Sequence, residues 1–144
     1  MPFRLIDSSV WITFLRPRPD PRLVKAVRRA LATGEAAVAA PIVVEVLSGI
    51  RDADEYAVRE EDFRSLRSVS VDGEAAFLGA RIGEALARAG QTSKTVDLLL
   101  AGAAIHSGAE LWSLADEHFS GIRTLIDQGG VRVPGPFRLL FLPE

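Results

Sequence analysis

The sequence predicts an α/β fold, a three-layer α/β/α sandwich with a mostly parallel sheet. Short apolar runs typical of buried strands alternate along the chain with longer segments of helical periodicity. Neither an internal repeat nor a linker interrupts this alternation, so we expect a single domain over residues 1–144. Hydrophobic residues make up 48% of the chain and charged residues 25%, which is the composition of an ordinary globular protein.

The first half of the chain alternates strand and helix twice. Its expected elements are a strand at 3–7, helices at 8–15 and 21–33, a strand at 36–40 and a helix at 41–50. A serine caps the first helix, and the prolines of "RPRPDP" end it. Asp20 caps the second helix, Pro21 takes its first position, and Gly34 ends it. In the short helix that follows, the apolar side chains form one arc, from which Glu45 points away.

The second half continues the same pattern. Its expected elements are a helix at 52–67, a strand at 68–71, helices at 72–89 and 96–106, and a strand at 110–114. Helical spacing predicts that Tyr56 and Phe77 face inward from the first two of these helices. The helix at 96–106 has apolar side chains on every side, which is typical of a buried helix. The segment after Gly121 is rich in turn residues, and residues 137–142 are either a last strand or a docked tail.

The composition excludes several function classes. The chain has no cysteine, so disulfides, thiolate metal sites and cysteine nucleophiles are excluded. The N-terminus lacks the pattern of a signal peptide, and no apolar run approaches the roughly 18–20 residues that span a bilayer. We therefore expect a cytoplasmic protein that has no membrane association.

The charge is unevenly distributed. The net charge is −2, yet residues 16–29 carry six basic side chains against one acid. Three of them, Arg22, Lys25 and Arg29, share a helix face. This face is either solvated surface or a contact for phosphate or a protein partner.

Four acidic residues stand near the ends of expected elements in apolar or small-residue surroundings: Asp7, Glu45, Asp97 and Asp116. Asp7 and Asp116 follow strands, and sites in parallel sheets lie beyond the carboxyl ends of strands. Converging carboxylates repel one another unless a cation holds them together. Oxygen ligands without a histidine or cysteine cluster favour Mg²⁺ or Mn²⁺, ions that suit phosphodiester cleavage. We interpret Asp97 as a metal ligand, direct or through water, although its place near a helix start also stabilises a charge.

Four segments that carry these acids resemble the PIN-domain family, in particular its VapC-type toxin ribonucleases. They are "LIDSSVWI", "VVEVLSGI", "TVDLLLAGAAIHSGAELW" and "ADEHFSGI", which contain in turn Asp7, Glu45, Asp97 and Asp116. The segments follow one another in the family's order over most of the chain. His118 stands where many relatives have a second acid, so the last segment departs from the family pattern.

The resemblance implies an endoribonuclease that is the toxin of a toxin–antitoxin pair. By this resemblance the four acids surround Mg²⁺ or Mn²⁺, and a metal-activated water attacks an RNA phosphate. It also implies a homodimer and a small cognate antitoxin protein. Candidate contacts to substrate or water are Ser8, Ser9, His118 and Lys94.

Two other functions remain open at this point. The first is a non-catalytic module of the same fold that binds RNA or a protein. The second is an aspartyl-phosphate phosphotransferase with Asp7 as nucleophile. Ser9 occupies the place where such enzymes carry a second acid, which argues against the phosphotransferase.

Overall fold

The computed structural model describes residues 2–115 and 117–143. The strands are β1 (Arg4–Ile6), β2 (Ala36–Val38), β3 (Arg67–Ser68), β4 (Glu110–Leu114) and β5 (Arg138–Leu142). The helices are α1 (Ser8–Leu15), α2 (Pro21–Ala32), α3 (Ala40–Leu47), α4 (Ala53–Arg64), α5 (Glu74–Arg88), α6 (Thr95–Ser107) and α7 (Glu117–Asp127).

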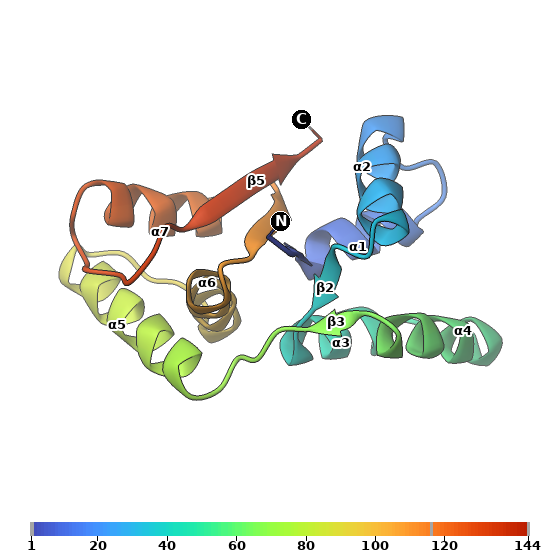
Figure 1. Ribbon diagram of the computed structural model, residues 1–144, viewed down its shortest axis with the longest axis horizontal. Helices are drawn as coiled ribbons and strands as arrows, with labels where there is room; N and C mark the ends of the chain where they lie inside the picture. Colours follow the sequence, from blue (N-terminus) through green and yellow to red (C-terminus); the bar gives the residue numbers. More distant parts are fainter. Residues whose placement is uncertain (1, 116, 144) are drawn as a thin grey trace.

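The strands form a parallel sheet in the order β3-β2-β1-β4-β5. α5, α6 and α7 lie together on one side of this sheet, and α1 and α2 lie on the other (Figure 1). This arrangement confirms the predicted α/β/α sandwich. The central strand β1 ends directly before Asp7, and its neighbour β4 ends at Leu114. The carboxyl ends of β1 and β4 therefore lie side by side at one edge of the sheet, as the sequence predicted.

Most predicted elements are present, with small shifts at their ends. The strand predicted at 68–71 is shorter and begins earlier, at Arg67. The tail at 137–142 is a strand, β5, that pairs with β4 over its whole length. The sequence reading missed α7, because Gly121 lies inside it and the neighbouring polar residues weaken its apolar period.

Two expected core residues are not buried. Phe77 on α5 is 70% exposed, and Tyr56 on α4 is 37% exposed, so the inward orientation predicted for both was wrong. Leu78, the neighbour of Phe77 for which the same helical spacing predicted an inward side chain, is buried and packs into the core. Helical spacing identifies an apolar face but cannot identify which flank of that face meets the protein interior.

The small residues of α6 allow it to lie directly against α5. A Cβ atom added at Gly79 of α5 would be 2.6 Å from the backbone oxygen of Leu98, closer than real Cβ atoms approach. A Cβ atom added at Gly102 of α6 would overlap the backbone oxygen of Ala75. Residues Leu100 to Ile105 of α6 are buried. This close contact fixes the position of α6, whose first turn carries Asp97.

Among the helices that the structure describes, none is long and apolar enough to cross a membrane.

Candidate active site

Asp7 occupies the junction between β1 and α1. Its backbone N–H donates to the carbonyl of Trp112 (2.8 Å), which extends the pairing of β1 with β4 by one residue. Its carboxylate caps α1 by accepting from the backbone N–H of Ser9 (3.3 Å), so the serine cap predicted for this helix was wrong. A carboxylate at a helix N-terminus is stabilised by the helix dipole. Asp7 is only 7% exposed, so its charge sits in a largely dry position.

Ser9 links Asp7 to the end of β4. Its hydroxyl donates to Asp7 Oδ2 (2.7 Å) and accepts from the backbone N–H of Leu114 (3.4 Å). Because both contacts use the same oxygen, the position of the Asp7 carboxylate depends on the last residue of β4. Ser9 thus orients the acid, and its hydroxyl is engaged within the protein rather than directed at a ligand.

Glu45 lies in the middle of α3, and its pKa depends on the other two described acids, Asp7 and Asp97. Partial loss of water around its carboxyl raises the pKa of Glu45, and the negative charges of Asp7 and Asp97 raise it further. A hydrogen bond from Ser8 and the positive charge of Lys94 act in the opposite direction. The acids on β1–α1, α3 and α6 therefore share one electrostatic environment, although they are far apart in the sequence.

Asp97 lies in the first turn of α6, with 15% of its side chain exposed. His118 Nδ1 of α7 is 3.7 Å from Asp97 Oδ2, and the His118 side chain is 47% exposed. Lys94, the residue before α6, is exposed and acts on Glu45. His118 and Lys94 therefore both act on the acids, His118 on Asp97 and Lys94 on Glu45, and their contact with substrate stays a prediction. The fourth predicted acid, Asp116, lies outside the described residues.

The donor set fits a hard divalent cation by type. Asp7, Glu45 and Asp97 offer only carboxylate oxygens, the ligands that Mg²⁺ and Mn²⁺ prefer. Within residues 2–115 and 117–143, no three acidic, histidine or cysteine side chains are close enough to hold an ion together. Uncompensated carboxylates repel one another, so we expect these side chains to close up only around a cation.

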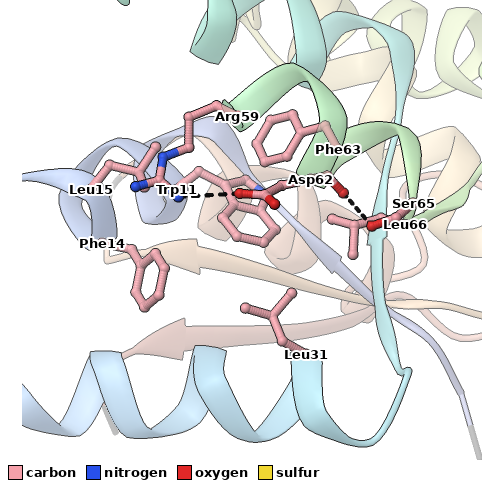
Figure 2. A pocket seen from close by; sticks show the side chains of 9 residues that line it. All are labelled: Trp11, Phe14, Leu15, Leu31, Arg59, Asp62, Phe63, Ser65 and Leu66. Carbon is pink, nitrogen blue, oxygen red and sulfur yellow. Dashed lines mark hydrogen bonds and ion pairs between the residues drawn. The ribbon is translucent and has the colours of Figure 1, made fainter. Parts of the chain in front are cut away.

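A separate apolar pocket of about 250 Å³ opens between α1, α2 and α4 (Figure 2). Its apolar lining consists of Trp11, Phe14, Leu15, Leu31, Phe63 and Leu66. The indole N–H of Trp11 is buried and has no hydrogen-bond partner among the described residues. Trp11 itself is 3% exposed. The pocket beside it could not be predicted from the sequence, because three helices that are separate in the chain form it.

Comparison with known proteins identifies the family. Residues 4–125 match the model of the PIN domain. The chain belongs to the PIN-domain family. A curated PIN-domain relative, ribonuclease VapC11 of Mycobacterium tuberculosis, is 36% identical over 111 residues, which cover 74% of this chain and 82% of that protein. The identity to this relative places the chain among the VapC ribonucleases, and the chain is therefore a nuclease.

Solved structures share the fold of this chain. The DNA-bound VapBC structure from Salmonella typhimurium matches 98% of both chains at 20% identity, with a TM-score of 0.66. VapBC2 from Rickettsia felis, bound to a promoter DNA fragment, matches 96% of this chain and 98% of that one at 16% identity, with a TM-score of 0.72. The sheet and helices of this PIN domain therefore have the arrangement found in those proteins.

Proposed function

We propose that this VapC-type chain is a divalent-metal-dependent endoribonuclease, the toxin of a toxin–antitoxin pair, with Asp7, Glu45, Asp97 and Asp116 as its catalytic acids. The observation that carries the proposal is the raised pKa of Glu45, which results partly from the charges of Asp7 and Asp97. Glu45 is thus near enough to Asp7 and Asp97, on two other elements, to be affected by their charges, which supports one shared acidic site. Membership of the VapC ribonucleases supports RNA as the substrate.

The residues of the chain have separate tasks in this proposal. Mg²⁺ or Mn²⁺, when bound, lowers the pKa of a water and neutralises phosphate charge. Asp7 and Asp97 would hold the ion, and each lies at the N-terminus of a helix, where a negative charge is stabilised. Glu45, whose pKa is raised, is suited to accept a proton from the attacking water. Lys94 and His118 lie exposed beside the acids, where they contact the phosphate of the RNA.

The test uses purified protein and a labelled single-stranded RNA. We expect the protein to cleave this RNA in the presence of Mg²⁺ or Mn²⁺ and to stop when EDTA is added. In Asp7→Asn and Asp97→Asn the cleavage rate is expected to fall by at least about 100-fold. Glu84→Gln is the matched control. It removes an exposed acid of α5, a helix that carries none of the proposed catalytic acids, and is expected to cleave normally. Cleavage by Asp97→Asn at the wild-type rate would refute the assignment. Unchanged melting curves of the variants would show that they fold.

The partner that we propose is a small antitoxin protein that fills the pocket between α1, α2 and α4. The six apolar side chains of this pocket and the unpartnered N–H of Trp11 support a protein ligand (Figure 2). Apolar side chains of the partner would cover the pocket, and a carbonyl would accept from the indole. Co-expression with an antitoxin gene found beside the gene of this chain, followed by co-purification of wild type and Phe14→Glu, tests this pairing.

We also propose a homodimer in the cytoplasm, the compartment of its RNA substrate and partner. Phe77 and Val44 are 70% and 65% exposed, and a second copy of the chain would remove such apolar surface from water.

A further inference from the structure

A groove of about 790 Å³ lies between α2 and the β4–β5 side of the sheet, separate from the pocket described above. One wall is the face of α2 that carries Arg22, Lys25 and Arg29. The floor is apolar and consists of Trp112, Leu140 and Leu142. The basic face that the sequence singled out is therefore one side of a concave surface.

The positive charge of this wall is not cancelled by the acids of the groove. Glu110 and Glu35 both line it and pair with Arg4, at 2.7 Å and 3.5 Å. Four basic side chains line the groove against these two acids, which leaves two positive charges in excess. Lys25 and Arg29 are exposed and form no ion pair with any described residue. The groove therefore presents an excess of positive charge on a protein whose net charge is −2.

The groove reaches the same edge of the sheet as the catalytic acids. Leu142 is the last residue of β5 and pairs with Leu114, the last residue of β4. Only β4 separates β5 from β1, after which Asp7 follows, so these strand ends lie about 10 Å apart across the sheet. α2 leads into β2, so its first turn, with Arg22, lies toward this edge, and Arg29 lies farther from it.

We propose that this groove binds the stretch of single-stranded RNA that flanks the cleaved phosphodiester, with Lys25 and Arg29 on its phosphates. This inference rests on the proposed ribonuclease function and assigns a second binding surface to it. The two cations stand one helical turn apart, about 6 Å along α2, and so form a row suited to a ligand with regularly repeated charges. A cationic groove with an apolar surface beside it is the arrangement by which proteins hold single strands.

RNA fits these observations better than an acidic peptide does. Both would satisfy the cations and the floor, but Leu142 of the groove lies at the edge of the sheet that carries the acids, where a substrate strand must pass. Arg22 is already held by Asp20 at 3.0 Å, so the phosphate contacts are assigned to Lys25 and Arg29.

The test measures RNA binding without cleavage. A fluorescent single-stranded RNA is titrated with the full chain in EDTA, and anisotropy gives the dissociation constant at several salt concentrations. In Lys25→Glu/Arg29→Glu the dissociation constant is expected to rise at least about tenfold. The slope of log K against log salt should fall by about 1.4, which corresponds to two lost phosphate contacts. With Mn²⁺ present, KM for a long RNA should rise while kcat stays unchanged.

The matched control is Arg28→Glu/Arg81→Glu. It makes the same change in net charge at exposed residues that do not line the groove, one of them on another face of α2. It is expected to retain the wild-type salt slope. Equal losses in both double variants would overturn the proposal, because they would reflect net charge alone. Unchanged RNA binding in Lys25→Glu/Arg29→Glu would also overturn the proposal. So would a result in which this variant keeps its affinity for RNA and loses only its affinity for a synthetic peptide of alternating Glu and Leu.

Failure of the groove and failure of the ribonuclease are separate results. A chain that cleaves RNA but binds it independently of Lys25 and Arg29 would contradict the groove alone. A chain that binds RNA through these residues but never cleaves it would contradict the proposed function and leave the groove assigned.

Discussion

Replacing Gly102 with alanine tests whether the contact between α5 and α6 positions the site. The added Cβ would overlap the backbone oxygen of Ala75 and would lie 2.9 Å from the backbone nitrogen of Gly79. Neither atom is the movable end of a side chain, so one helix must shift. Overpacking of this kind costs about 3 kcal/mol, which lowers the Tm of a chain this size by about 10 °C.

The same shift is expected to reduce cleavage. Asp97 lies five residues before Gly102 on the same helix, and a displacement of about 1 Å at a catalytic group costs about 100-fold in rate. Calorimetry and RNA cleavage at a temperature where the variant is folded measure the two effects. Gly83→Ala is the matched control, because its Cβ would meet only the tip of Leu98, at 2.7 Å, and helix propensity offsets the strain. A Gly102→Ala protein with the wild-type Tm and activity would refute the reasoning.

Three further predictions concern the acids and the surface. In EDTA at pH 7, Glu45→Gln is expected to raise the Tm, because the fold raises the pKa of this carboxyl and so penalises its charged form. The gain in Tm should disappear as the pH falls below 4.5, the ordinary pKa of a glutamate, because the carboxyl is then protonated in both states. A gain in Tm that is the same at every pH in thermal scans would show that the raised pKa is not its cause. Ser9→Ala is expected to weaken Mn²⁺ binding and cleavage about tenfold, and Ser9→Thr to restore much of both; calorimetric titration and cleavage rates that are equal in all three proteins would exclude an orienting role. Phe77→Glu is expected to convert a dimer into a monomer in light scattering, whereas a dimer that survives would place the interface elsewhere.

The edge of the sheet that carries the acids could be predicted from local sequence. An apolar run that stops at a polar residue marks the end of a buried strand, and Asp7 follows such a run directly. The same reasoning located the end of β4 at Leu114. Glu45 could be separated from the core because α3 has a single apolar arc.

Features that depend on contacts between distant elements could not be predicted this way. The sequence shows that α6 is apolar on every side, but only the structure shows that Gly102 meets α5. The contact of His118 with Asp97 joins α7 to α6, and α7 itself was not predicted. Lys94 was expected to contact substrate or water, and the effect of its charge on Glu45, a residue of another helix, could not be predicted from the sequence.

The central claim is that acids from β1–α1, α3 and α6 hold one divalent cation. A crystal of the protein soaked in MnCl₂ and measured for anomalous scattering tests it most directly. The account predicts a manganese peak about 2.1 Å from carboxylate oxygens of Asp7 and Asp97, with Glu45 bound to the ion or to its water. A map with no peak between these acids, at a manganese concentration that supports cleavage, would contradict it.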